Sequence, residues 1–314
     1  MSQTPPLFNQ IEAWQEKLPA LKGRVSFNEP LAKRNWFATG GVAEVFIEPA
    51  DAEDLSLLLK TLPDTPITLL GGGSNVLIRD GGIPGITLHL GKEFADISLS
   101  GTQITCGAGA LKNKVAQFAI ENALSGFEFL ACIPGTIGGG ISMNAGCYGQ
   151  EFVDVLISLT AMTRSGELKV ITEPAKSFLA HRTCLLPDSW IFLSATLQGT
   201  PANPEEIKQR IAENKTKKAA SQPVAERTAG STFKNPEGNA AWKLVDASGM
   251  RHASVGDACV SEKHANFLVN KGGATSSQIE QLGEAIRQKV LETSHINLEW
   301  EIKRLGVPLA EEDK

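Results

Sequence analysis

Two glycine-rich stretches are the part of the chain whose residue types and spacing are most suited to chemistry. The longer one includes Gly135, Gly138, Gly139 and Gly140, and the shorter one covers residues 71–75. Glycines permit positive φ and a close approach of a ligand to the backbone, and exposed backbone N–H groups bind phosphate oxygens. We therefore expect the two stretches to cradle a diphosphate without a dedicated cation.

The glycine spacing excludes the two most familiar nucleotide-binding motifs. A dinucleotide fingerprint needs G-x-G-x-x-G at the start of a helix, and a P-loop needs G-x-x-x-x-G-K-[ST]; neither stretch satisfies its template. Residues 71–75 lie between apolar runs at 66–70 and 76–78, which predicts a turn between two strands. Each stretch alone could be a turn that only reverses the chain, but two of them in one half of the chain favour a ligand.

The composition is that of a soluble enzyme with more than one packed unit. The chain has 314 residues, 42% of them hydrophobic, which is enough for two or three cores. A net charge of −5 argues against a nucleic-acid partner. The five cysteines include no C-x-x-C pair and the five histidines no metal-binding spacing, so we expect reduced thiols and no metal. Without a secretory leader or an apolar run of about 20 residues, we expect a cytoplasmic protein that does not insert into membranes.

The elements that must position the glycines form an α+β unit that ends near Gly199. A stripe of leucines predicts a helix over 50–62, and a second helix is predicted over 110–124. Strands are predicted at 67–70, 76–78, 86–90, 104–107, 155–162, 168–172 and 190–197.

A second, smaller α+β unit is predicted to follow. It begins with a helix that Asn203 caps, with Pro204 at its first position. A long helix should start at Thr275 or at Ser277, with Ile279, Leu282, Ile286 and Val290 on its buried face. The further predicted elements are a polar loop over 222–236, a helix over 241–248 stopped by Gly249, a strand near 265–269 and a final strand over 296–302, where apolar and polar residues alternate.

Five motifs, taken in order, resemble those of one enzyme family. They are Asn35-Trp-Phe-Ala-Thr-Gly-Gly41, Gly71-Gly-Gly-Ser-Asn75, Ile133-Pro-Gly-Thr-Ile-Gly-Gly139 with Met143-Asn-Ala-Gly146, Gly230-Ser-Thr-Phe-Lys-Asn-Pro236 and Glu299-Trp-Glu-Ile-Lys303. Their series, from about residue 24 to 306, is similar to that of the shorter branch of the UDP-N-acetylenolpyruvoylglucosamine reductase family.

The resemblance implies a domain plan and a reaction. The plan is an N-terminal extension (1–23), a two-subdomain FAD-binding domain of the vanillyl-alcohol-oxidase type (24–200), a smaller α+β substrate domain (201–306) and an acidic tail (307–314). The implied reaction reduces an enolpyruvyl ether on a UDP sugar to the lactyl ether of UDP-N-acetylmuramate. It would use non-covalent FAD, with NADPH as co-substrate, in a protein that we expect to be a monomer.

The resemblance also implies roles for individual residues. Arg182, Ser231 and Glu301 would be catalytic: Arg182 and a protonated Glu301 would stabilise charge on the substrate carboxylate, and Ser231 would deliver a proton to the carbanion. Arg182, Lys234 and Asn235 would bind the UDP sugar. The residues expected to bind FAD are Gly71, Gly72, Gly73, Ser74, Asn75, Pro134, Gly135, Thr136, Gly138, Gly139, Asn144 and Ala145.

Several alternatives stay open on the residues alone. Without the resemblance, Arg182 is a surface arginine, Ser231 a loop serine and Glu301 part of a solvated strand face, which periodicity does not distinguish from Glu299. His181 stands where the family usually has tyrosine. Residues 263–266 are interpreted as scaffold. The rival functions are a sugar or lactone oxidase of the same fold, although residues 71–75 offer no histidine or cysteine to tether flavin, and a non-catalytic FAD-binding protein.

Overall fold

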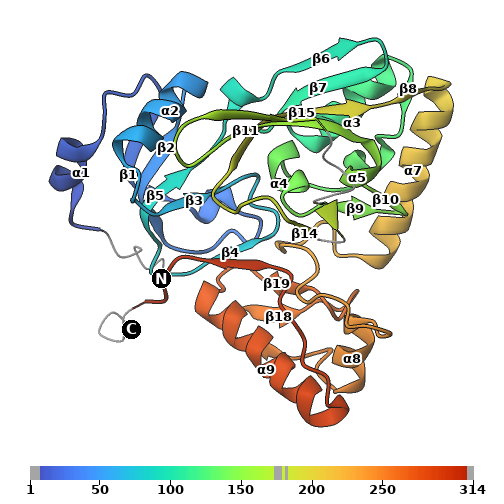
Figure 1. The fold of residues 1–314 in the computed structure, drawn as a ribbon. Helices are drawn as coiled ribbons and strands as arrows, with labels where there is room; N and C mark the ends of the chain where they lie inside the picture. Colours follow the sequence, from blue (N-terminus) through green and yellow to red (C-terminus); the bar gives the residue numbers. More distant parts are fainter. Residues whose placement is uncertain (1–7, 173–178, 181–182, 310–314) are drawn as a thin grey trace.

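The first layer of the fold is a four-stranded mixed sheet, drawn in shades of blue in Figure 1. This computed structural model describes residues 8–172, 179–180 and 183–309. The strand order is β1-β2-β5-β3; β1 and β2 are antiparallel, whereas β2, β5 and β3 are parallel. These strands are β1 (Arg24–Pro30), β2 (Val42–Glu48), β3 (Ile67–Leu69) and β5 (Ile83–Leu88).

The helix predicted over 50–62 is confirmed as α2 (Ala52–Thr61), which packs on this sheet. Asp51 caps it by accepting a hydrogen bond from the Asp54 N–H, and Leu55, Leu58 and Leu59 of the predicted leucine stripe are buried. The prediction missed β1 and β2 and placed β5 three residues late. In β2 the run from Val42 to Ile47 is buried on both faces, so it shows no alternation to detect.

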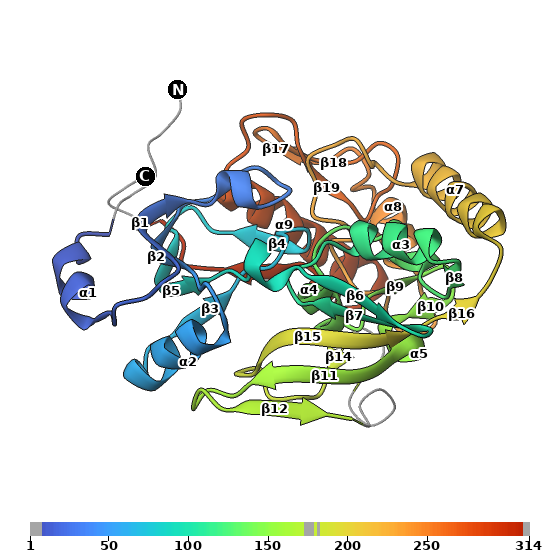
Figure 2. The ribbon, with the colours of Figure 1, turned by 90° about the horizontal axis from the view of Figure 1, so that it is seen from above.

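The second layer is a five-stranded antiparallel sheet with the order β12-β11-β15-β7-β6 (Figure 2). The strands are β6 (Ile97–Ser100), β7 (Gln103–Gly107), β11 (Leu156–Met162), β12 (Leu168–Ile171) and β15 (Ile191–Gln198). All but β6 were predicted. Helices α3 (Lys112–Glu121), α4 (Ile137–Ile141) and α5 (Phe152–Val155) share a core with it. The prediction of a helix over 110–124 is too long, because α3 ends at Glu121 and Ala123 has a positive φ of 55°.

Helix α7 (Pro204–Ser221) begins as predicted, with the Asn203 side chain accepting a hydrogen bond from the Glu205 N–H. Its Ile207 and Ile211 pack against Ile120 of α3. The helix therefore runs along the second layer, where it is drawn in gold in Figure 1. The domain limit near residue 200 stays a prediction.

The third layer is a small antiparallel sheet covered by helices, drawn in orange and red in Figure 1. Its strands are β17 (Ser254–Val255), β18 (Ala258–Val260) and β19 (Leu268–Asn270), and its helices are α8 (Ala241–Ala247) and α9 (Ser276–Ser294). Both helices were predicted, and the four residues predicted to form the inner face of α9 are buried. Of the two predicted starts, the structure has Thr275, which forms a capping box with Gln278.

The predicted strand over 296–302 is wrong. Burial alternates there, with Leu298 and Ile302 buried and Glu299 exposed, but regular strand begins only at β20 (Lys303–Leu305). The preceding residues form a single bridge, between Phe233 and Trp300. An alternation of apolar and polar residues indicates which side chains face a core, but a strand also needs a neighbouring strand to pair with.

Strand β20 joins the third layer to the first by pairing in parallel with β4 (Val76–Ile78). Ion pairs strengthen this junction: Glu280 of α9 accepts hydrogen bonds from Arg79 at 2.7 Å and from Arg304 at 2.7 Å. Asp80 accepts hydrogen bonds from the Ser276 and Ser277 N–H groups at the start of α9.

The remaining described elements are short. They are α1 (Ile11–Lys17), η1 (Ala32–Arg34), η2 (Lys92–Phe94), η3 (Glu128–Ala131), β8 (Leu124–Ser125), β9 (Gly146–Cys147), β10 (Gln150–Glu151), β13 (Leu179–Ala180), β14 (Thr183–Cys184) and β16 (Thr200–Pro201).

Candidate active site

The two glycine stretches meet in space although about 60 residues separate them in the chain. The Ser74 hydroxyl donates a hydrogen bond to the Pro134 carbonyl at 3.3 Å. A Cβ added to Gly72 would lie 2.7 Å from the Cα of Gly135, and one added to Gly71 would lie 3.0 Å from the Thr136 hydroxyl oxygen. Only glycine allows this backbone-to-backbone approach. The first stretch is the predicted turn between two strands, because it connects β3 to β4.

The motif at residues 35–41 packs against the first glycine loop. The Trp36 N–H donates to the Gly73 carbonyl at 3.0 Å. Gly73 has a φ of 63°, and any Cβ there would collide with the Arg34 carbonyl oxygen. The position of Gly73 is therefore fixed by both conformation and packing.

The second glycine stretch differs from its predicted form. Of its four glycines only Gly135 has a positive φ, of 97°, because the other three belong to α4. For Gly138 and Gly140 the absence of a side chain serves close packing: a Cβ on Gly138 would lie 2.9 Å from the Ala108 Cβ, and one on Gly140 would collide with the Phe152 ring. The loop proper is therefore limited to residues 134–136.

Most backbone N–H groups expected to face a ligand here are already bonded within the protein. Gly138 donates to the Ala108 carbonyl at 2.8 Å, and Ala145 donates to the Gly140 carbonyl at 2.8 Å. The Asn144 side chain is fully buried; it accepts from the Val153 N–H at 3.0 Å and donates to Glu151 at 2.8 Å. These residues shape the base of the loop.

Ser231 and Glu301 come from distant parts of the chain and lie on paired backbone. The Glu301 N–H donates to the Thr232 carbonyl at 2.8 Å. The same segment contacts the first glycine loop, since the Asn75 side chain donates to the Glu301 carbonyl at 3.3 Å and the Lys303 N–H donates to the Asn75 carbonyl at 3.1 Å. Glu301 therefore lies beside Asn75 of the first glycine loop, and Ser231 directly precedes Thr232, with which the Glu301 backbone pairs. Arg182 and His181 lie outside the described residues.

Asn266 holds the loop that carries Ser231. Its side chain accepts from the Phe233 N–H at 3.0 Å and donates to the Phe233 carbonyl at 2.8 Å, and its own carbonyl accepts from Thr232 N–H at 2.8 Å. His264 accepts from the Asn266 N–H at 3.2 Å, and burial lowers the pKa of its imidazole. The interpretation of residues 263–266 as scaffold is confirmed.

The structure separates the two glutamates that periodicity left equivalent. Glu299 is exposed and forms an ion pair with Lys234 at 3.1 Å, whereas Glu301 is half-buried beside the glycine loop. The Asn235 side chain accepts from the Ala241 N–H at 3.0 Å at the start of α8. Lys234 and Asn235 are both exposed.

A buried cation, Lys112, was missed by the sequence analysis. Its side chain is 4% exposed, and its Nζ lies 3.8 Å from the position that a Cβ on Gly135 would occupy. Its backbone N–H donates to the Gly135 carbonyl at 3.1 Å. The sequence signal that could have identified Lys112 is its position three residues before Val115, on the buried face of α3.

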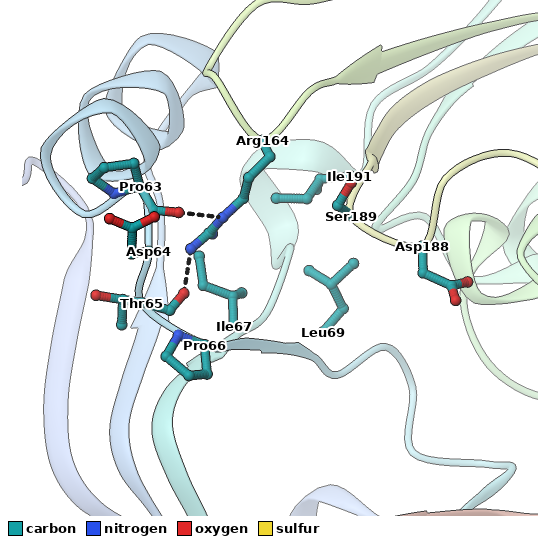
Figure 3. Close-up of a pocket in the computed structure, with 10 residues that line it drawn as sticks. All are labelled: Pro63, Asp64, Thr65, Pro66, Ile67, Leu69, Arg164, Asp188, Ser189 and Ile191. Atoms are coloured by element: carbon teal, nitrogen blue, oxygen red, sulfur yellow. Dashed lines mark hydrogen bonds between the residues drawn. The ribbon is translucent and has the colours of Figure 1, made fainter.

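A separate cavity of about 290 Å³ lies between β3 and the start of β15 (Figure 3). Leu69, Asp188 and Ile191 line it, together with Arg164. The Arg164 guanidinium donates to the carbonyls of Pro63, at 3.0 Å, and Thr65. The arginine therefore organises the turn before β3, and no predicted site residue in the described part of the chain lines this cavity.

Two further properties concern the described residues alone. None of their helices has the length and apolar content needed to cross a membrane. Their His, Cys, Asp and Glu side chains form no group of three or more that could hold a metal ion.

The chain matches two protein families and several known proteins. Residues 43–172 match a family described as an FAD binding domain, and residues 222–305 match the C-terminal domain of UDP-N-acetylenolpyruvoylglucosamine reductase. The reductase of that name from Paramagnetospirillum magneticum is 50% identical over 295 residues, covering 94% of this chain and 96% of the relative. The one from Azorhizobium caulinodans is 45% identical over 306 residues, covering 97% and 99%.

A solved structure is similar over most of the chain. It is the UDP-N-acetylenolpyruvylglucosamine reductase of Thermus caldophilus, with a TM-score of 0.79, 31% identity, and coverage of 90% of this chain and 99% of that chain. The predicted fold class, a two-subdomain FAD-binding domain followed by a smaller α+β domain, is confirmed by these matches.

Proposed function

Because the chain belongs to the UDP-N-acetylenolpyruvoylglucosamine reductase family and is thus an FAD-dependent oxidoreductase, we propose that it converts UDP-N-acetylenolpyruvoylglucosamine to UDP-N-acetylmuramate with NADPH. This places it in cytoplasmic peptidoglycan precursor synthesis. The observation that carries the proposal is the contact between the first glycine loop and the segment of Glu301, which pairs with the loop of Ser231.

The glycine loops fit a bulky diphosphate-containing cofactor. A Cβ on Gly139 would meet only the Thr136 hydroxyl oxygen, at 3.4 Å, and Gly139 is exposed. Ser74 and Thr136 bring hydroxyl groups to the contact between the loops. We assign residues 71–75 and 134–136 with Gly139 to the direct FAD contact, and Gly138, Asn144 and Ala145 to its support. FAD, when bound, supplies the hydride.

The protein's own residues would stabilise charge and move a proton. Addition of hydride to the enol ether leaves negative charge on the substrate, which the half-buried Glu301, if protonated, stabilises by donating a hydrogen bond. Arg182 is assigned the cationic role on the substrate carboxylate. Ser231 protonates the substrate carbon, and its position is held because Asn266 fixes the adjacent Thr232 and Phe233. Lys234 and Asn235, both exposed, are assigned to the UDP group.

The function is tested by following the flavin absorbance of the purified holoenzyme. Anaerobic NADPH should bleach the spectrum, and UDP-N-acetylenolpyruvoylglucosamine should restore it with formation of UDP-N-acetylmuramate. Restoration by oxygen alone, with no response to the UDP sugar, would identify an oxidase. A spectrum that NADPH does not change would support a protein that only binds FAD.

We propose that the Lys112 ammonium group, which lies against Gly135, forms an ion pair with the FAD diphosphate. Lys112→Met should weaken FAD binding by roughly 10- to 150-fold, since a hydrogen bond to a charged group contributes about 1.5–3 kcal/mol. The measurement is fluorescence quenching of FAD by apoprotein, at low and high salt. Lys114→Met is the matched control, because Lys114 is exposed on the same helix. Equal affinities of the two variants would contradict the assignment.

A further inference from the structure

Cys132 and Cys147 form a thiol pair beside the second glycine loop. Cys132 lies between η3 and Pro134, and Cys147 is in β9. The Cys147 thiol donates a hydrogen bond to the Phe129 carbonyl oxygen at 3.6 Å, and the Cys132 N–H donates to the same oxygen at 3.0 Å, so the two cysteines are neighbours. Cys132 is 6% exposed and Cys147 is only partly buried, so the pair reaches the surface through Cys147. A spacing of 15 residues hides the pair from any search for C-x-x-C.

Lysines of α7 give this pair a cationic environment. The Lys218 Nζ donates to the Cys132 carbonyl at 2.6 Å. The hydrogen bond from Cys147 is the largest cause that lowers the pKa of Cys132 to about 7, and the charges of Lys218 and Lys215 add to it.

The other thiols in the described residues show the opposite behaviour. Burial raises the pKa of Cys106 to about 12, and it also raises the pKa values of Cys184 and Cys259. Since the thiolate is the nucleophile, these three are poor candidates for oxidation at neutral pH and serve as internal references.

We propose that Cys132 and Cys147 are a peroxide-reactive dithiol, in which Cys132 attacks the oxidant and Cys147 closes a disulfide. The Cys132 thiolate attacks one oxygen of a hydroperoxide; the O–O bond breaks, an S–O bond forms, and the released alkoxide or hydroxide takes up a proton. The Cys147 thiol then attacks the Cys132 sulfenic acid, and the S–S bond forms as water leaves. The two sulfurs together lose two electrons and the peroxide gains them.

The disulfide would sit close to the cofactor loops. Cys132 lies two residues before Pro134, and the Pro134 carbonyl accepts the hydrogen bond from Ser74. The bond would therefore tie the start of the second glycine loop to β9. The modification requires no turnover, so it can be tested independently of the proposed reaction.

The test is peptide mass spectrometry of the reduced holoenzyme after brief treatment with stoichiometric hydrogen peroxide and alkylation of remaining thiols. We expect a linked peptide that contains Cys132 and Cys147, two hydrogens lighter than the reduced peptides, with Cys106, Cys184 and Cys259 alkylated. Recovery of Cys132 and Cys147 as alkylated thiols while Cys184 or Cys259 is oxidised would overturn the proposal.

Single variants test the roles of Cys132, Cys147 and Lys218 separately. Cys147→Ser should leave a Cys132 sulfenic acid that a sulfenic-acid-specific probe traps, and Cys132→Ser should remove the reaction.

Alkylation of Cys132 should have a midpoint near pH 7 in the unmodified protein. Lys218→Met should move that midpoint upward by about one pH unit, because a nearby cation favours the thiolate. Lys217→Met, on the exposed side of α7, should leave it unchanged. A midpoint that responds equally to both lysines would contradict the assigned role of Lys218.

Discussion

Ser231→Ala should leave the reduction of bound flavin by NADPH intact and slow its reoxidation by UDP-N-acetylenolpyruvoylglucosamine by roughly 10²- to 10⁴-fold, the usual contribution of a positioned general acid. In our proposal this hydroxyl donates the proton that the substrate carbon receives, and the oxidation of NADPH does not use that proton. Loss of one hydroxyl should not change the loop, since Asn266 bonds to the backbone of Thr232 and Phe233. Anaerobic stopped-flow measurement of the two half-reactions separates the steps.

The control for this experiment is Ser254→Ala, because Ser254 is exposed on β17 in the same layer. It should leave both half-reactions unchanged. A Ser231→Ala enzyme that loses both half-reactions to the same extent would show that the serine supports the site as a whole, and its assignment as proton donor would fail.

Gly72→Ala should release FAD while the protein remains folded. The new methyl group would lie 2.7 Å from the Gly135 Cα, so the two loops must move apart. Gly72 does not have a positive φ, so alanine suits its backbone and the effect is one of space alone. Overpacking of this kind costs about 1–3 kcal/mol, which corresponds to roughly 5- to 150-fold weaker FAD binding. Fluorescence titration of apoprotein gives the affinity, and circular dichroism checks the fold.

Gly91→Ala is the matched control, since its added Cβ would meet only a Glu48 carboxylate oxygen at 3.6 Å. We expect its FAD affinity to equal that of the unmodified protein. If Gly72→Ala binds FAD as tightly as Gly91→Ala, the contact between the two glycine loops does not define the cofactor site.

Local patterns in the sequence predicted elements well where one face of the element alone is buried. The inner face of α9 and the leucines of α2 follow this rule, and both helices were located. Strand β2 was missed because it is covered on both faces, and residues 296–302 were assigned to a strand because alternation reports burial without reporting a pairing partner.

The candidate site was predictable only through motifs. Nothing local distinguishes Glu301 from Glu299; the difference is that one lies beside Asn75 and the other pairs with Lys234. Lys112 and the Cys132–Cys147 pair went unrecognised because their neighbours come from other elements. Such proximity between distant residues is a property of the tertiary structure, which spacing along the chain does not encode.

The parallel pairing of β20 with β4 has a consequence for biosynthesis. A ribosome exposes β4 and the first glycine loop more than two hundred residues before Lys303 appears, because the partners are Lys303–Val76 and Leu305–Ile78. Until then β4 lacks this neighbour and Asn75 lacks the Glu301 carbonyl. FAD capture should therefore be a late event of translation, and nascent chains arrested before residue 301 should emerge without bound flavin.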